Sequence, residues 1–194
     1  MLNSALVIIH DEHRSLAAVV HGLRYLVREM RERNAPPNFK LLWAMIFYLE
    51  EFPAKLHHPK EDAYLFARVR QRTHEADAVV AELELQHREG AQHVRELERA
   101  LGHYEAGSPD GLARFSAAVE KFGAEVMKHM ALEESSLIPL AKKHLTAEDW
   151  VEIGAIFSEN GDPRFDASDQ ECRDLFSRIV NLAPPPIGLG PARE

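Results

Sequence analysis

The sequence lacks the features that mark secreted, membrane-spanning or nucleic-acid-binding proteins. It contains one cysteine, Cys172, so no disulfide can form within the chain. It has no N-terminal signal peptide and no apolar run of about 20 residues, the length that crosses a bilayer. Its formal net charge of -8 disfavours nucleic acids and anionic membranes, since both attract clustered lysine and arginine. We therefore expect a cytoplasmic protein without nucleic-acid or membrane partners.

The sequence also lacks the alternation of apolar and polar residues that is typical of strands, and it has no long-range repeat. Its apolar residues instead follow the periodicity of helices. A chain of 194 residues with 45% hydrophobic content can bury one substantial core. In residues 3–33 apolar side chains recur every three or four positions, as on the buried face of a bundle helix. Pro36 and Pro37 then forbid continuation of this helix.

A second helix is predicted from Asn38, which can cap its first turn, to about Arg72. Its apolar line is less regular than that of the first helix, because Pro53 and Pro59 each remove a backbone donor. We expect a kink near His57.

Two more long helices follow. Thr73 is the expected N-cap of the third helix, which stops near Gly102. Ser108 is the expected N-cap of the fourth, with Pro109 at its first helical position and basic residues 142–144 in its last turn. Short loops between four helices favour an antiparallel up-and-down bundle.

Beyond the bundle, two shorter helices are predicted. Residues 146–158 form the first, and Ser168 with Glu171 forms a capping box for the second, which ends near Leu182. The fold class is therefore all-α, a four-helix bundle with two additional C-terminal helices. The organisation is a bundle at 1–145, a helical extension at 146–183, and an extended or disordered tail at 184–194. Some apolar side chains of the extension could cover the bundle or form a homodimer contact: Ile153, Ile156, Phe157, Leu175 and Phe176.

Two pairs with the spacing His-x-x-x-Glu interrupt the apolar lines, His57 with Glu61 and His129 with Glu133. Four residues on a helix turn through about 400°, so the two members of each pair lie one above the other. Burying a polar group without partners costs roughly 2 to 7 kcal/mol, and more for a charge. Both pairs therefore need a compensating partner.

The other two bundle helices carry single histidines on their apolar lines, His13 and His87. Counted from the shared end of an antiparallel bundle, all the polar interruptions lie about ten to fifteen residues deep, within one layer at roughly 15 to 22 Å. Four imidazoles and two carboxylates that converge there can bind one or two first-row metal ions. Iron or manganese is favoured over zinc, because structural zinc sites usually include thiolates.

Three further residues stay open as ligands: His10, His58 and Glu84. His10 is rotated by about 60° from the apolar line, so His13 is preferred. His58 lies about 100° from His57, which continues the line. Glu84 forms a single Glu-x-x-His pair with His87, and we expect it to be solvated or to orient an imidazole from outside the ligand set.

Four segments resemble, in order and spacing, the helical motifs of the hemerythrin-like His-His-Glu cation-binding domain: His10-Asp11-Glu12-His13-Arg14, His57-His58-Pro59-Lys60-Glu61-Asp62, Gln86-His87-Arg88 and His129-Met130-Ala131-Leu132-Glu133-Glu134. The resemblance spans about residues 3–144. It implies an oxo- or hydroxo-bridged centre of two iron ions, with manganese or zinc less favoured. The terminal ligands would be His13, His57, His87 and His129, and the bridging ligands Glu61 and Glu133.

One position departs from the oxygen-carrying hemerythrins, which have a second histidine four residues after the ligand of the third helix. Ala91 stands there in this chain. The ligand set is more similar to the iron-sensing and iron-centre-repair branches of the family. We expect a diiron protein that engages dioxygen, nitric oxide or peroxide as a sensor, scavenger or store. Alternatives are a peroxidase or ferroxidase-like enzyme, and a structural or partner-binding module with a stabilising metal.

Overall fold

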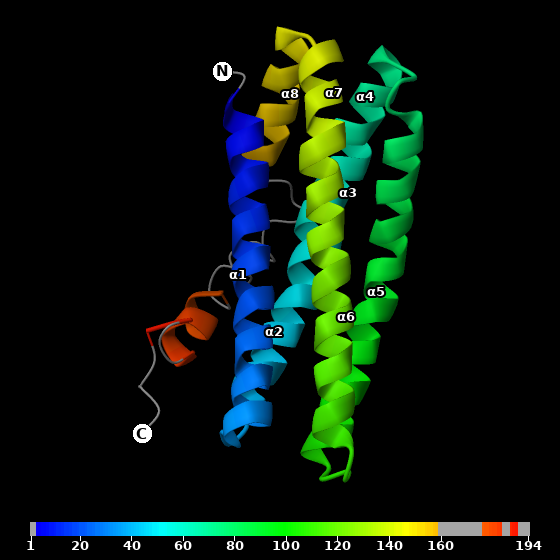
Figure 1. Cartoon of the computed structure of the whole chain (residues 1–194). Helices are drawn as coiled ribbons and strands as arrows, with labels where there is room; N and C mark the ends of the chain where they lie inside the picture. Colours follow the sequence, from blue (N-terminus) through cyan, green and yellow to red (C-terminus); the bar gives the residue numbers. More distant parts are fainter. Residues whose placement is uncertain (1–2, 159–175, 184–186, 190–194) are drawn as a thin grey trace.

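The computed structural model describes residues 3–158, 176–183 and 187–189, and in these ranges the chain is helical without strands (Figure 1). Four long helical columns run antiparallel. The first is α1 (Asn3–Arg33) and the third is α5 (Asp77–Glu105). The second runs from α2 to α4 and the fourth from α6 to α7. The predicted all-α bundle is confirmed.

The second and fourth columns each contain π turns. The second consists of α2 (Phe39–Phe52), η1 (Pro53–His57), α3 (His58–Lys60), η2 (Glu61–Phe66) and α4 (Ala67–Arg72). The fourth consists of α6 (Gly111–Leu132), η3 (Glu133–Leu137) and α7 (Ile138–His144). In these turns an amide reaches five residues back, as from His58 to the Pro53 carbonyl. The distortion predicted near His57 is therefore a widening of the helix.

The starts of the helices test the predicted caps. Asn38 caps α2, accepting a hydrogen bond from the Leu41 N–H at 3.1 Å. Thr73 does not cap α5, because its hydroxyl closes a local turn with an amide two residues on and the helix begins at Asp77. Residues 108–110 form a turn instead of the cap and first turn of α6, which begins at Gly111.

Two apolar clusters fill the bundle, one on each side of a polar level. On α1, Ile9 belongs to one cluster and Leu16 to the other, with His13 between them. The same alternation occurs along the other columns. Five buried polar side chains at this level have exposed fractions of 7% or less: His13, His57, Glu61, His129 and Glu133. The bundle therefore encloses a polar layer between two dry cores.

Helix α8 (Ala147–Ser158) lies along α1, at the end of the bundle where α4 and α7 also lie (Figure 1). Ile153 and Phe157, each 2% exposed, join the apolar cluster that contains Ile9. Gly154 lets the two helices approach closely, since a Cβ at this position would lie only 2.5 Å from the Ser4 hydroxyl. These two apolar side chains therefore pack against the bundle.

The second C-terminal helix is described at residues 176–182, where Phe176 packs against Tyr48 with ring centroids 5.5 Å apart. In the tail, the Leu189 N–H donates to the Val180 carbonyl at 2.8 Å. The predicted capping box at Ser168 and Glu171, like Leu175, lies outside the described residues.

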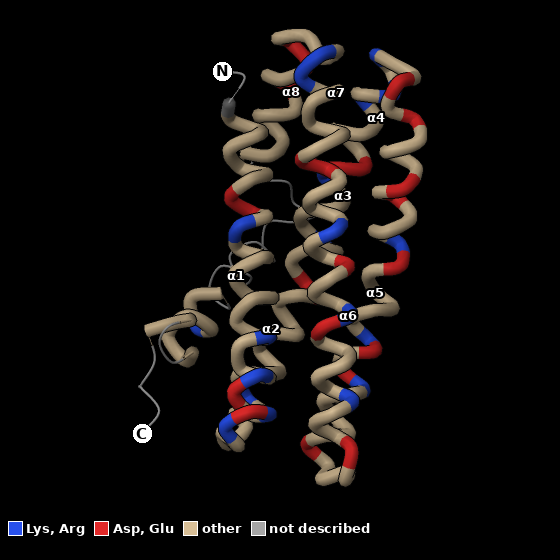
Figure 2. Tube along the Cα trace, in the orientation of Figure 1, with Lys and Arg blue, Asp and Glu red and all other residues tan. Residues whose placement is uncertain are grey.

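Acidic and basic residues alternate along the long helices (Figure 2). Some form pairs four residues apart, such as Arg33 with Glu29 and Arg114 with Asp110. Each such exposed pair contributes roughly 0.3 to 0.5 kcal/mol to helix stability. No described helix combines the length and the apolar character that crossing a membrane requires.

Asp149 anchors α8 to the second column. Its buried carboxylate accepts hydrogen bonds from Arg68 at 2.6 Å and from Arg72 Nε at 2.7 Å. It also accepts from the Thr146 N–H, while the Thr146 hydroxyl accepts from the Asp149 N–H, which is a reciprocal cap. The bonds from Arg72, together with those from Thr146 and Arg68, hold the pKa of Asp149 well below its usual value. This carboxylate therefore stabilises the folded state as an anion.

We predict that Asp149→Asn lowers the free energy of unfolding by about 2 kcal/mol at pH 7, because two arginines lose a charged acceptor. A lowered pKa in the folded state gives stability that is present above the ordinary value of 3.8 and lost as the pH falls below it. Urea unfolding should therefore show that the difference in free energy of unfolding between the unmodified protein and Asp149→Asn becomes smaller in acid. Glu152→Gln is the control, since Glu152 binds the same Arg68 but is 58% exposed. Equal effects of both substitutions would contradict this role.

Candidate metal centre

The structure brings all six predicted ligands to one level of the bundle, and His58 joins them. They form two groups of potential ligands, each with its nitrogen or oxygen atoms within 4.8 Å of one another. The first group is His13, His57, Glu61 and Glu133. The second is His58, His87 and His129. All four columns contribute, so the centre exists only when the bundle is assembled.

The first group is closed and fully buried. His13 Nε2 lies 3.0 Å from His57 Nε2 and 3.2 Å from Glu133 Oε2. His57 Nε2 lies 3.0 Å from Glu61 Oε1. The exposed fractions of these four side chains are 3% or less.

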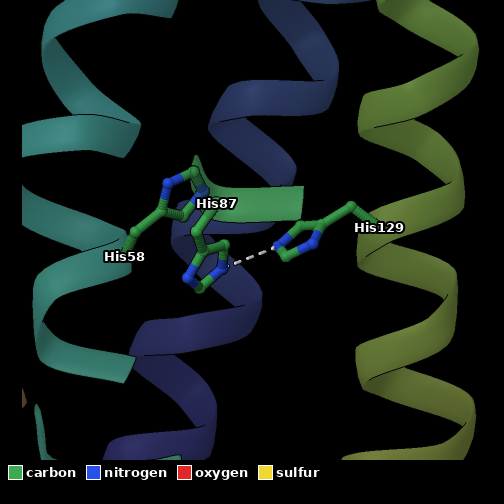
Figure 3. Close-up of side chains that lie close together, drawn as sticks. All are labelled: His58, His87 and His129. Atoms are coloured by element: carbon green, nitrogen blue, oxygen red, sulfur yellow. Dashed lines mark hydrogen bonds between the residues drawn. The ribbon is translucent and has the colours of Figure 1, made fainter. Parts of the chain in front are cut away.

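The second group consists of three imidazoles from three columns (Figure 3). His87 Nε2 is 3.3 Å from His129 Nε2, and the His58 ring stacks on His87 with centroids 3.9 Å apart. Glu61 joins the two groups, because its second oxygen lies 3.4 Å from His87 Nε2. One carboxylate thus presents one oxygen to each group.

His58 is the residue that sequence reasoning placed outside the preferred set. On a regular α-helix it would point about 100° away from His57. The π turn η1 ends at His57 and holds one more residue than an α turn. His57 is buried, and the partly buried His58 also turns toward the other histidines. The flanking prolines at 53 and 59 were the available signal, since each removes an α-helical hydrogen bond.

The other two open residues lie outside both groups. His10 is partly exposed on α1 and belongs to neither group of potential ligands. Glu84 pairs with Arg70, its Oε2 lying 3.0 Å from Arg70 Nη2. Of the two expectations, solvation or orientation of an imidazole, the structure shows neither directly, because the carboxylate pairs with an arginine of the neighbouring column.

The outward nitrogens of four imidazoles are held by other side chains. The Nδ1 atoms of these histidines lie within hydrogen-bonding distance of a side-chain oxygen, and the pairs are His13 with Glu134 at 2.9 Å, His57 with Glu12 at 2.9 Å, His87 with Asp62 at 2.8 Å and His129 with Gln86 at 3.1 Å. Oxygen acceptors at Nδ1 fix the tautomer and point Nε2 with its lone pair at the centre. This is the arrangement typical of metal-binding histidines.

These four hydrogen bonds form a closed ring around the bundle. Each orienting residue directly precedes or follows a potential ligand of its own column and holds a histidine of the next column. Glu12 links the first column to the second, Asp62 the second to the third, Gln86 the third to the fourth, and Glu134 the fourth to the first. Displacing one helix would disturb a ligand on its neighbour as well.

The donors fit a bound cation. With Nδ1 donating outward, His13 and His57 direct two lone pairs at each other across 3.0 Å, a repulsive contact unless a cation or proton lies between them. The four carboxylate oxygens of Glu61 and Glu133 are buried and accept no hydrogen bond of acceptable geometry. Orphaned buried charges of this kind are too costly to keep without compensation.

Without a metal, the groups compensate one another only in part. Burial opposes protonation of His57, but Glu61 and Glu12 overcome it and raise the pKa of His57 well above its usual value. At His87, burial likewise opposes protonation, but the hydrogen bond with Asp62 and the nearby Glu61 carboxylate outweigh it and raise the pKa to about 9.

In two other potential ligands, the pKa shifts favour the neutral form of the side chain. Burial and the nearby Glu61 raise the pKa of Glu133 to about 7, although the adjacent His13 opposes this. Burial lowers the pKa of His129 to about 3, against the attraction of Glu61 and with the added repulsion of His87. Some of these ligands thus favour the protonated form and others do not. A divalent cation would take the place of the bound protons, since metals bind deprotonated ligands.

We predict that Asp62→Asn weakens divalent metal binding by about 10- to 100-fold, because His87 loses the carboxylate that orients it. Competition with a chromogenic chelator measures the change. Glu84→Gln is the matched control, as Glu84 lies near His87 in sequence but pairs with Arg70. Metal affinity that is unchanged in Asp62→Asn, or equally reduced in both variants, would show that the ring does not act on the ligands.

Comparison with known proteins gives one family. The family description that matches is the hemerythrin HHE cation binding domain, over residues 4–141. Neither the curated proteins nor the solved structures give a significant match. The matched range covers most of the chain and includes both groups of potential ligands, which agrees with a cation site between the four columns. The chain belongs to the hemerythrin HHE cation-binding domain family.

Proposed function

We propose that the chain holds two iron ions between its columns and engages a small ligand such as dioxygen, nitric oxide or peroxide. His13 and His57 would hold one ion, and His58, His87 and His129 the other. Glu61 and Glu133 would lie between them as shared carboxylates. The observation that carries the proposal is the set of four buried carboxylate oxygens without hydrogen bonds, beside five converging imidazoles.

His58 changes the nitrogen count that the sequence suggested. Ala91 removes the histidine that oxygen carriers have on the third helix, but His58 stacks on His87 from the second column instead. The second ion would then have three imidazoles and the first ion two. The donors are nitrogens and carboxylate oxygens without a thiolate, which suits iron or manganese.

Bound iron would supply a reversible change of oxidation state and an open position for a small ligand. The protein would supply the environment for it. The two apolar clusters lie on either side of the polar level, and the ring of hydrogen bonds holds the imidazoles in place. Burial of the ligands strengthens each metal–ligand interaction, because the local dielectric is low.

Reconstitution with ferrous iron under anaerobic conditions tests the proposal. After removal of unbound metal we expect about two iron ions per chain, since the ligands divide into two groups. Exposure to oxygen should produce a charge-transfer band that the anaerobic sample lacks. Less than stoichiometric iron together with an unchanged spectrum would refute a diiron function.

We further predict that His58→Ala reduces bound iron from about two ions to about one per chain, because the second ion loses one of three nitrogens. Iron analysis and the oxidised spectrum measure this loss. His21→Ala is the control, since His21 is exposed on α1. Retention of both ions in His58→Ala, with the spectrum of the unmodified protein, would remove His58 from the ligand set.

A further inference from the structure

A cavity of about 220 Å³ opens beside the second group of histidines. His58, His87 and His129 line it, whereas none of His13, His57, Glu61 or Glu133 does. The two halves of the centre therefore differ in access. A molecule that enters from this side meets the three-histidine half first.

Small residues on α5 make room for the cavity. Gly90 and Ala91 line it opposite Pro53 and Ala54 of the second column. A Cβ built on Gly90 would meet no atom within 4 Å, so packing of the helices does not require glycine there. A larger side chain at either position would project into the open space.

The interior walls of the cavity are apolar. Aliphatic and aromatic side chains from all four columns form them, namely Leu16, Leu49, Val94, Phe122 and Val126. A cavity of roughly 150 Å³ with such walls is large enough to bind benzene. A diatomic ligand would leave most of this cavity empty.

Carboxylates surround the cavity. Glu50, Glu51, Glu89 and Glu125 line it, and Lys55 is already paired with Glu51. Burial and repulsion from Glu98 and Glu51 raise the pKa of Glu50, which agrees with a negative surrounding. Such a rim repels anions, and a metal ion at the inner histidines would repel a cationic group that reached it.

We propose that this cavity binds a small, mainly apolar and uncharged organic molecule, whose polar end faces His58, His87 and His129. The inference rests on the proposed function in one respect, the metal that the polar end would face. Binding of the apolar part depends only on the cavity walls. The two claims can therefore fail separately.

Three probes with the same ring and different charge test the selectivity: benzyl alcohol, benzylamine and benzoate. Calorimetric titration of zinc-loaded protein at pH 7 should give one site for the alcohol, with Kd on the order of 1 mM or tighter. Benzylamine and benzoate should each bind at least about tenfold more weakly, because the ammonium would face the metal and the carboxylate must pass the acidic rim. Absence of binding by the alcohol, or binding of either charged probe as tight as that of the alcohol, would overturn the proposal.

Two substitutions on α5 test the location. Gly90→Leu should weaken benzyl alcohol binding by about tenfold or more, as the new side chain fills the cavity. Gly102→Leu is the matched control, since a Cβ at Gly102 also meets nothing within 4 Å but Gly102 does not line the cavity. Leucine favours the helix over glycine at both positions, and thermal unfolding checks that both variants fold. Equal affinity of the two variants would place the probe elsewhere.

Repeating the titrations on metal-free protein separates this proposal from the proposed function. Probe binding that persists without metal, in a chain that takes up no iron, would refute the diiron function and keep the cavity. Iron uptake of about two ions in Gly90→Leu, with probe binding lost, would support both. Iron uptake without probe binding in the unmodified chain would refute the cavity alone.

Discussion

The structure depends on balancing charge at one level of an otherwise apolar bundle. Glu61 and Glu133 are fully buried, and their four oxygens have no hydrogen bonds. Adjacent imidazoles lower the pKa of Glu61 well below its usual value against the effect of burial, so this carboxylate stays anionic, whereas Glu133 shifts toward its neutral form. A cation between these groups removes both the repulsion and the need for uneven protonation. The ligands thus make the folded bundle and the bound metal mutually dependent.

The same polar level explains why the core is divided. Ile9 and Leu16 belong to different apolar clusters although they lie on one face of α1, because His13 separates them. The cluster on the side of Ile9 is extended by α8, which contributes Ile153 and Phe157. Asp149 fixes α8 in place through the second column. The C-terminal extension therefore completes the dry core at one end of the bundle.

The sequence predicts the four columns and the convergence of His13, His57, His87 and His129. The spacing of apolar residues defines each buried helix face, and the number of residues from the helix end gives the depth of each histidine. It does not predict the three π turns, since these arise where proline and packing shift the helical register. His58 therefore stayed open as a ligand, because a regular α-helix would turn it about 100° away from His57. The misplaced cap at Thr73 has a similar cause, as a threonine hydroxyl closes a turn as readily as it caps a helix. The residues that hydrogen-bond the histidine Nδ1 atoms lie on other helices, so they can be identified only from the three-dimensional structure.

The π turn η1 and the small residues of α5 act on the same part of the site. The turn brings His58 inward against His87, and under the proposed diiron function this imidazole would replace the one that Ala91 does not provide. The space beside Ala91 and Gly90 stays open and forms part of the cavity. Taking a nitrogen donor from the second column and not from the third would thus keep the number of donors and leave the path to them open. A histidine at position 91 would line this cavity itself and take up part of its volume, so the position of the donors and the size of the cavity would be linked.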